Sequence, residues 1–189
     1  MARACRVLGA RNLVLVGFMG VGKTRVGRLA ATLLHRPFID TDAMIARRAA
    51  MSIPDVFAQL GEEGFRGLES QVVAEVSRHL GQVVATGGGT LGRTENVERL
   101  RASGLLVALS ARSDIILARV GGAQAGRERP LLRTEDPLET ITQLREKRAA
   151  MYQAADLQLD TSDLDVIEVA SALLFRLADF QDRRGEGEA

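Results

Sequence analysis

The fold of this chain is decided by the stretch Leu13-Val14-Leu15-Val16-Gly17-Phe18-Met19-Gly20-Val21-Gly22-Lys23-Thr24. Its last eight residues match the pattern G-x-x-x-x-G-K-[ST], and its first four form an apolar run typical of a buried strand. Backbone N–H groups in such a glycine-rich turn cradle phosphate oxygens, and the following helix adds the positive end of its dipole. The lysine reaches the β- and γ-phosphates, and the threonine hydroxyl can bind Mg²⁺. The stretch therefore predicts a phosphate-binding loop at the end of a strand.

The lysine in this loop strengthens that prediction. The chain has only two lysines, Lys23 and Lys147, against 23 arginines. A compact ammonium fits among the phosphates, whereas the flat fork of an arginine does not replace it there. A glycine-rich turn that matches the pattern by chance is the alternative, and it would not explain why a chain that otherwise uses arginine keeps lysine at this position.

Composition indicates one globular domain. The 189 residues suffice for a sizeable core, and the 46% hydrophobic and 26% charged residues are ordinary for a soluble protein. A net charge of +1, with 4% aromatic residues and no Trp, argues against nucleic acid, and no apolar run approaches a membrane span. The single cysteine, Cys5, suits a reducing cytoplasm. We expect a cytoplasmic monomer that binds neither nucleic acid nor membrane.

Short apolar runs alternate with helical patterns along the chain. The expected strands are 13–16, 37–39, 83–86, 105–109 and 157–159, and the expected helices are 23–35, 41–60, 65–80, 95–102, 113–120, 138–152 and 165–180. In the expected helix 65–80, six apolar residues share one helical face: Phe65, Leu68, Val72, Val73, Val76 and Leu80. This alternation predicts an α/β fold with a parallel sheet covered on both faces, and ligands at the carboxyl ends of its strands.

We expect three segments in the domain organisation. Residues 1–11 lack the apolar core of a signal peptide and are expected to be a short flexible leader. Residues 12–181 form the single domain, with a lid at about 121–133. Residues 182–189 are polar and glycine-containing, so we expect a flexible tail.

Two carboxylates follow the second expected strand, in Asp40-Thr41-Asp42. At a strand end, one of them can belong to the Mg²⁺ shell, and the other can orient or deprotonate an attacking hydroxyl. Helix capping by Asp or Thr is the alternative interpretation, and it is common. Behind a phosphate-binding loop, the functional interpretation is favoured.

Three glycines follow the third expected strand, in Thr86-Gly87-Gly88-Gly89-Thr90. They can bring the backbone close to a ligand and leave N–H groups for an anion or for sugar-like hydroxyls, although a tight turn alone would use them as well. The strand itself, Val83-Val84-Ala85-Thr86, carries no acidic residue. The task of holding the metal therefore falls on Thr24 and Asp40.

Arginines supply the remaining candidate groups. Arg66 opens one expected helix and Arg148 lies on another, and either could form a bidentate pair with a substrate carboxylate. Taken singly, any arginine in this chain is more often a solvated surface residue.

The glycine-bearing loop 121–132 carries Arg127 and Arg129, and could either close over bound phosphates or be an ordinary surface loop. His35 and His79 lack metal-ligand spacing.

Taken together, these motifs resemble the shikimate kinase family from about residue 12 to residue 161. The elements that carry the resemblance, in the family's order, are Gly17–Thr24, Phe38-Ile-Asp-Thr-Asp42, Gly61-Glu-Glu-Gly-Phe-Arg66 with Glu69, Thr86–Gly89, Arg129-Pro-Leu-Leu132, Arg148 with Tyr152, and Asp160-Thr161. The resemblance implies a nucleoside-monophosphate-kinase-like, three-layer α/β/α fold with five parallel strands, a substrate-binding helical region and a mobile lid. It also implies ATP-dependent phosphorylation of the 3-hydroxyl of shikimate, on the route to chorismate and the aromatic amino acids.

The resemblance also implies roles for single residues on the ATP side. Lys23 would serve the phosphates, Thr24 the Mg²⁺, and Asp40 the same metal, through water. Arg129 would be the catalytic lid arginine, and Arg119 would flank adenine together with the loop after Asp160. The expected ATP contacts in full are Gly17, Met19, Gly20, Val21, Gly22, Lys23, Thr24, Arg25, Arg119 and Arg129.

On the acceptor side, the resemblance implies that Asp42 holds the shikimate hydroxyls and acts as the base. Arg66, Arg148 and the backbone N–H groups of the glycine loop would bind the carboxylate and ring hydroxyls. Phe57 and Phe65 would form the apolar side of that pocket. The expected substrate contacts in full are Asp42, Phe57, Phe65, Arg66, Gly87, Gly88, Gly89 and Arg148.

Two features depart from the family's pattern. Position 25 is Arg where a second small hydroxyl residue is usual, and the lid has extra residues before Arg129, which leaves open whether Arg127 or Arg129 acts in closure. Neither departure removes a central catalytic group, so we do not interpret the chain as a degenerate kinase. The competing functions are a gluconate kinase of the same fold and a non-catalytic nucleotide-binding module, and a binding module would not need Lys23, Asp40, Asp42 and Arg129 together.

Overall fold

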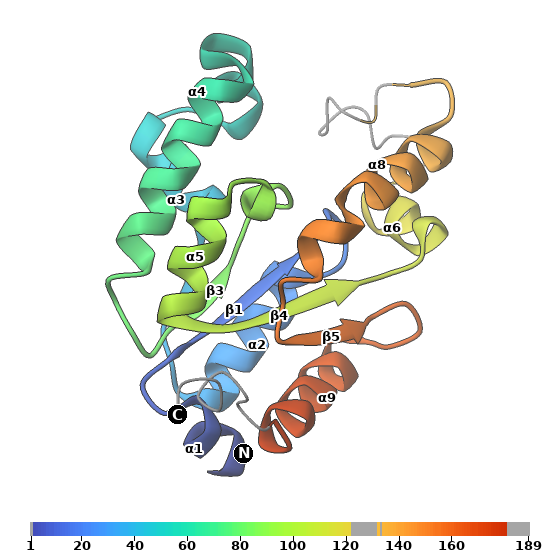
Figure 1. The fold of residues 1–189 in the computed structure, drawn as a ribbon. Helices are drawn as coiled ribbons and strands as arrows, with labels where there is room; N and C mark the ends of the chain where they lie inside the picture. The colour runs from blue at the N-terminus through green and yellow to red at the C-terminus, as the bar shows by residue number, and fades with distance from the viewer. Residues whose placement is uncertain (1, 122–131, 133, 181–189) are drawn as a thin grey trace.

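A parallel five-stranded sheet forms the centre of the computed structural model, which describes residues 2–121, 132 and 134–180 (Figure 1). The strand order is β2-β3-β1-β4-β5, and every neighbouring pair is parallel. The bounds are β1 Asn12–Gly17, β2 Phe38–Asp40, β3 Val83–Ala85, β4 Gly104–Ser110 and β5 Leu157–Asp160. Each strand overlaps its expected range, and the predicted α/β fold is confirmed.

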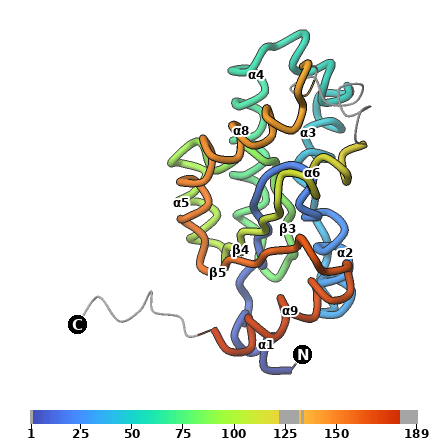
Figure 2. Tube along the Cα trace, turned by 90° about the vertical axis from the view of Figure 1, so that its right-hand side faces the viewer, coloured from blue at the N-terminus to red at the C-terminus, as the bar shows by residue number. Residues whose placement is uncertain are grey.

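Side chains of the central strand supply two separate cores, because successive residues of a strand point to opposite faces. Leu13 and Leu15 belong to one buried cluster, and Val14 and Val16 belong to the other. Figure 2 shows α2 and α5 on opposite sides of the sheet. The first cluster includes residues of α1 Ala2–Leu8, α2 Lys23–Leu34, α6 Ser113–Arg119, α8 Pro137–Tyr152 and α9 Val166–Ala178. The second includes residues of α3 Thr41–Ala49, α4 Ile53–Val76, the 3₁₀ helix η1 Thr90–Gly92 and α5 Thr94–Ser103.

The N-terminal segment differs from the loose leader that we expected. It forms α1, in which Ala4 and Leu8 are fully buried, and this helix packs against α9. The Arg36 guanidinium donates to the carbonyl oxygens of Gly9 and Arg11 and so ties the following turn to the end of α2. The segment is ordered because small and apolar residues at i and i+4 face the first core. The tail expected at 182–189 lies outside the described residues.

The helical region after β2 also differs from expectation. The single helix expected over 41–60 is divided, because α3 ends before Ala50, which has a left-handed φ of 52°, and α4 starts at Ile53. The side chain of Ser52 accepts from the Asp55 N–H and caps the new helix. A kink at Gly61 then joins what we expected to be two helices. The helix ends at Val76, so Leu80 is not on its buried face as predicted but is 57% exposed.

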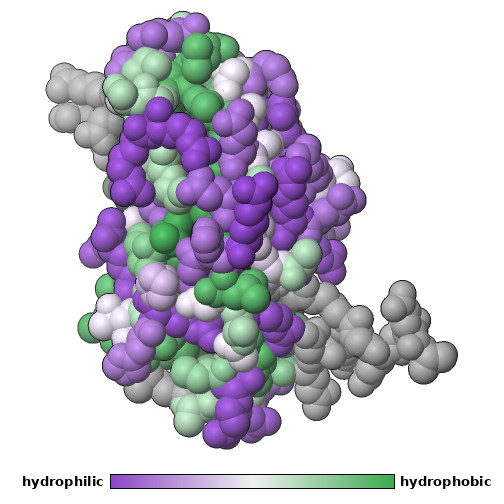
Figure 3. Space-filling view, turned by 90° about the vertical axis from the view of Figure 1, so that its left-hand side faces the viewer, coloured by the Kyte–Doolittle hydropathy of each residue, from purple (hydrophilic) through white to green (hydrophobic). Residues whose placement is uncertain are grey.

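The carboxyl ends of the parallel strands lie along one edge of the sheet, flanked by α4 on one side and by α6 and α8 on the other (Figure 1). Figure 3 shows that the face with α3 and α4 is mainly hydrophilic, with hydrophobic residues at its upper end, over α4, and in smaller groups lower down. The exposed Phe57 and Leu60 belong to this helix. In the described part of the chain, no helix combines the length and the apolar character needed to cross a membrane.

Candidate active site

The phosphate-binding loop leads from β1 into α2, as predicted. Gly17, Gly20 and Gly22 have φ values of 136°, 76° and 99°, which L side chains rarely adopt. A Cβ at Gly17 would lie 2.2 Å from the carbonyl oxygen of Leu109, so only glycine fits beside β4. The N-cap Gly22 makes no side-chain capping bond, and the first turn of α2 holds no acidic residue. The helix N-terminus therefore presents backbone N–H groups and a positive dipole end to an anion.

Lys23 folds back over this loop. Its Nζ donates to the carbonyl oxygens of Gly17 and Phe18, each at 2.8 Å. The ammonium group is thus held at the loop, where phosphate oxygens would lie, and not extended into solvent. Met19 and Val21 occupy the loop itself, and Arg25 is exposed on the first turn of α2.

The two residues predicted to serve a metal meet at the edge of the sheet. The Thr24 hydroxyl donates to Asp40 Oδ2 at 2.9 Å. The other carboxylate oxygen, Oδ1, accepts the N–H of Ala43 at 3.2 Å and caps α3. The sequence left open whether Asp40 caps a helix or faces the metal site. In the structure it does both, because one oxygen caps α3 while the other faces the phosphate-binding loop.

This pair of oxygen donors fits Mg²⁺. Magnesium prefers hard oxygen ligands, keeps several waters and is usually completed by substrate phosphates. Within the described ranges, no three His, Cys, Asp or Glu side chains cluster as a metal cage would require. One hydroxyl and one carboxylate beside a phosphate-binding loop are what such a partly hydrated ion needs from the protein.

The three-glycine loop brings the acceptor-side residues together. A Cβ on Gly87 would lie 2.8 Å from Asp42 Oδ1, and a Cβ on Gly89 would lie 2.5 Å from Arg66 Nη2. A Cβ on Gly88 would lie 3.3 Å from the backbone nitrogen of Met19 in the phosphate-binding loop. A side chain at any of these positions would crowd its neighbours, most closely at Gly87 and Gly89, and the loop joins the two predicted halves of the site.

Arg66 is half-buried on α4. Its Nη1 donates to Glu69 Oε2 at 2.8 Å, and its Nη2 lies 3.4 Å from Glu62 Oε1. Burial opposes the charge of the guanidinium, but the contacts with Glu69 and Glu62 outweigh it and raise the pKa of Arg66. A cation with further donors is therefore fixed beside the glycine loop and can pair with a carboxylate.

Arg148 approaches the loop from α8. Its Nη1 lies 3.4 Å from the carbonyl oxygen of Gly88, and its guanidinium carbon lies 5.6 Å from the ring centroid of Phe18. On the same helix, the Tyr152 hydroxyl donates to the Gly88 oxygen at 2.7 Å. Burial raises the pKa of Tyr152 to about 12, although the nearby Arg148 acts in the opposite direction. Tyr152 is thus a neutral donor at physiological pH.

The predicted apolar side of the pocket lies on α4. The rings of Phe57 and Phe65 stack with their centroids 4.3 Å apart and an interplanar angle of 22°. Phe65 is buried, whereas Phe57 is 36% exposed. The Arg66 guanidinium lies 5.3 Å from the Phe65 ring centroid, so the cation and the apolar wall adjoin.

Arg119 lies beside the loop after β5, as expected. Its guanidinium donates to Thr161 Oγ1 at 2.8 Å and to the Thr161 carbonyl oxygen at 2.6 Å. The Thr161 hydroxyl in turn lies 3.1 Å from the carbonyl oxygen of Val21. Arg119 is therefore connected to the outer side of the phosphate-binding loop. Arg127 and Arg129, and most of the lid expected at 121–133, lie outside the described residues.

Two residues of this site had no predicted role. Tyr152 and Thr90 contact the glycine loop through the Gly88 and Gly87 carbonyl oxygens. Tyr152 carried a weak signal, since the only tyrosine of the chain stands four residues after Arg148 and hence on the same helix face. Thr90 follows the glycines directly and gave no signal beyond that position.

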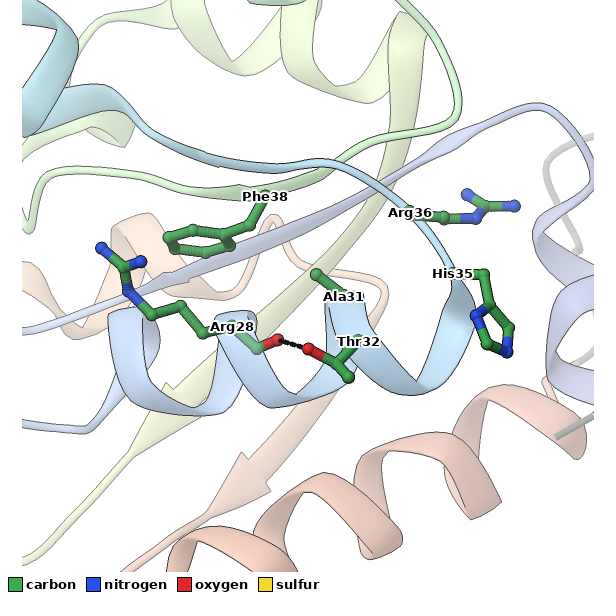
Figure 4. Close-up of a pocket in the computed structure, with 6 residues that line it drawn as sticks. All are labelled: Arg28, Ala31, Thr32, His35, Arg36 and Phe38. Atoms are coloured by element: carbon green, nitrogen blue, oxygen red, sulfur yellow. Dashed lines mark hydrogen bonds between the residues drawn. The ribbon is translucent and has the colours of Figure 1, made fainter.

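A separate open cavity of about 450 Å³ lies along the C-terminal half of α2 (Figure 4). The Arg28 guanidinium lies 5.0 Å from the centroid of the Phe38 ring, and the Thr32 hydroxyl donates to the Arg28 carbonyl oxygen at 3.1 Å. Arg36 uses its guanidinium on two backbone carbonyls. These polar groups contact other parts of the fold, and none of the six lining residues belongs to the predicted site.

Comparison with known proteins identifies relatives that match most of the chain. The family model described as "Shikimate kinase" matches residues 19–178. The shikimate kinase of Caldanaerobacter subterraneus subsp. tengcongensis is 43% identical over 164 residues, which are 87% of this chain and 94% of that protein. The shikimate kinase of Rhizobium meliloti is 39% identical over 179 residues, which are 95% of this chain and 92% of that protein.

Comparison with solved structures identifies the same family. The shikimate kinase from Acinetobacter baumannii in complex with shikimate is 34% identical, with a TM-score of 0.83, and the match covers 90% of this chain and 94% of that one. A gluconokinase from Sinorhizobium meliloti, 16% identical with a TM-score of 0.52, is similar in fold alone. Since the family model spans most of the chain and its relatives match at nearly full length, the chain belongs to the shikimate kinase family.

Proposed function

We propose that this chain transfers the γ-phosphoryl group of ATP to the 3-hydroxyl of shikimate, giving ADP and shikimate 3-phosphate. The observation that carries the proposal is the three-glycine loop. Gly88 lies against Met19 of the phosphate-binding loop, while Gly87 and Gly89 lie against Asp42 and Arg66. A phosphoryl donor and a small carboxylic acid with several hydroxyls would therefore meet at one loop, as in-line transfer requires.

The acceptor pocket suits the chemistry of shikimate. Arg66 and Arg148 approach the glycine loop from two helices and would pair with the substrate carboxylate. Asp42 and backbone N–H groups of the loop would hold the ring hydroxyls. Phe57 and Phe65 would cover the apolar part of the ring. Family membership supports the same substrate, because the Acinetobacter baumannii relative is described in complex with shikimate.

Transfer needs few covalent steps from the protein. The 3-hydroxyl oxygen bonds to the γ-phosphorus, and the bond from that phosphorus to the β,γ-bridging oxygen breaks, so that ADP leaves. The hydroxyl proton passes to the Asp42 carboxylate. Lys23 and the N–H groups at the start of α2 stabilise charge on the phosphate oxygens, and Arg129 would do so from the lid.

We infer that Thr24 and Asp40 hold Mg²⁺ in the loaded enzyme, Asp40 through water. Their oxygens lie 2.9 Å apart beside the phosphate-binding loop, which supports this assignment. When bound, the ion neutralises part of the phosphate charge. Arg119 would flank the adenine, and Arg25 would extend the ATP contacts. We further infer a monomer that acts in the cytoplasm, on the route to chorismate and the aromatic amino acids.

The position of the new phosphate tests the proposal. Purified enzyme is incubated with MgATP and shikimate until ADP formation ends, and the product is examined by correlated ³¹P and ¹H NMR. We expect the phosphorus to couple to the proton on carbon 3. A phosphate on another carbon, or unchanged shikimate, would reject the assignment of the acceptor.

A further inference from the structure

A buried polar cluster lies behind the three-glycine loop and consists of Thr90, Glu69 and Asn96. The three side chains come from η1, α4 and α5, and none is more than 1% exposed. Since their side chains are shielded from solvent, they are not themselves available to bind a substrate. They can still determine how the residues in front of them are held.

The Glu69 carboxylate is shared between two donors. Its Oε2 accepts from Arg66 Nη1 at 2.8 Å, and its Oε1 accepts from the Thr90 hydroxyl at 2.7 Å. A buried carboxylate is stable only when its oxygens are hydrogen-bonded, and bonds to a charged acceptor are stronger than neutral ones. With both oxygens engaged, the plane of the carboxylate is set, and with it the direction in which Arg66 is held.

Thr90 also belongs to the glycine loop. Its Oγ1 lies 3.0 Å from the Gly87 carbonyl oxygen, and its own carbonyl oxygen accepts from Asn96 Nδ2 at 3.1 Å. Arg66 packs against the same loop, since a Cβ at Gly89 would lie 2.5 Å from its Nη2. One hydroxyl therefore joins α4, which carries the cation, to the loop that carries the backbone donors.

We propose that Thr90 is a positioning residue for substrate binding: its hydroxyl holds the Glu69 carboxylate against the glycine loop and thereby fixes Arg66 in the orientation that receives the substrate carboxylate. This role rests on the proposed function, because it assigns Arg66 to the shikimate carboxylate. It predicts an effect on acceptor binding with little effect on ATP or on the transfer step.

The test uses three substitutions at this position. Thr90→Val removes the hydroxyl at nearly constant shape, Thr90→Ala removes it with less volume, and Thr90→Ser retains it as the matched control. We expect Val and Ala to raise KM for shikimate on the order of tenfold, with kcat within about threefold of the wild type. We expect KM for ATP to be unchanged, and Ser to stay within about twofold of the wild type in every parameter.

Two results would overturn the role of Thr90. One is a KM for shikimate that is unchanged in Thr90→Val and Thr90→Ala. The other is a parallel loss of ATP affinity and thermal stability in both variants, which would indicate damage to the fold alone. A wild type that releases no ADP with shikimate would instead reject the proposed function, and that result is seen before any variant is compared.

Discussion

At the scale of single residues, the acceptor side depends on the absence of a side chain at two positions of the glycine loop, Gly88 and Gly89. Gly89 leaves no room for a methyl group beside the Arg66 guanidinium, and at Gly88 a Cβ would lie only 3.3 Å from the backbone nitrogen of Met19 in the phosphate-binding loop. Gly92, three residues after Gly89 at the end of η1, has only ordinary contacts, with Met151 Cε at 3.7 Å from a Cβ. An alanine should therefore be disruptive at Gly89 and tolerated at Gly92.

Gly89→Ala should impair acceptor binding. The new methyl would overlap Arg66, which would have to move away from the loop, and a displaced fork no longer forms a bidentate pair with a carboxylate. We expect KM for shikimate to rise about tenfold or more, with KM for ATP unchanged. Steady-state kinetics checks this, with Gly92→Ala as the control. Equal effects of the two substitutions would argue against contact between Arg66 and the substrate.

Asp42→Asn should stop turnover while leaving ATP binding largely intact. The amide cannot accept the hydroxyl proton as a carboxylate does, and loss of a general base typically lowers rates about 10²–10⁴-fold. Single-turnover kinetics would measure the transfer step, and calorimetric titration with ATP would confirm that the donor site is intact. A near-normal rate in this variant would refute the assignment of Asp42 as the base.

Residue types and spacing predicted much of this site, but not the buried residues that hold its side chains in place. The G-x-x-x-x-G-K-[ST] pattern predicted the loop and Lys23, and the pair Asp40 and Thr24 was predicted from their positions after two strands. Thr90 could not be given a role, because its contact with Glu69 joins segments 21 residues apart. Such contacts depend on tertiary packing, which no local pattern encodes.

At the scale of elements, the strands were predicted better than the helices. Apolar runs such as 105–109 identify buried strands directly, since both faces of the sheet are covered. The division between α3 and α4 was missed, although Ser52, Pro54 and Asp55 form a helix-start signal inside the expected helix. The prediction gave more weight to the longer periodic pattern over residues 41–60 than to this short helix-start signal.

The kink in α4 gives a prediction at this scale. Gly61 has φ 67° and ψ −177°, a conformation open essentially to glycine, while Gly67 lies in regular helix with open space at its Cβ position. Gly61→Ala should lower the free energy of unfolding by about 1–3 kcal/mol. Gly67→Ala should raise it by roughly 0.5–1 kcal/mol, because alanine favours helix.

Urea denaturation of both variants measures this difference. The kink lies between Phe57 and Phe65, whose rings stack, so we expect Gly61→Ala to weaken shikimate binding in addition. If the two alanine variants were equally stable, the backbone strain assigned to position 61 would be absent.

At the scale of the whole molecule, the chain closes its first core with its own N-terminus. Figure 1 shows α1 beside α9, at the end of the molecule away from α4 and α8. Charge and composition predicted a single domain but could not predict this helix, because seven residues carry too few positions for a periodic signal.

Leu8→Ala should therefore destabilise the fold without changing the chemistry. Leu8 is fully buried, and truncation of a buried leucine typically costs about 2–5 kcal/mol. Arg6→Ala, at an exposed position of the same helix, is the control and should be nearly neutral. Thermal unfolding measures the difference, and kcat at low temperature should stay at the wild-type value. An unchanged melting temperature in Leu8→Ala would show that α1 does not seal the core.

The central claim is that one glycine loop joins a phosphate-donor site to a pocket for shikimate. The most direct measurement is ADP release by the purified chain with MgATP, first without acceptor, then with shikimate, then with gluconate. The account predicts rapid release with shikimate and only background release in the other two reactions. Release with gluconate in place of shikimate, or none with either despite ATP binding, would contradict it.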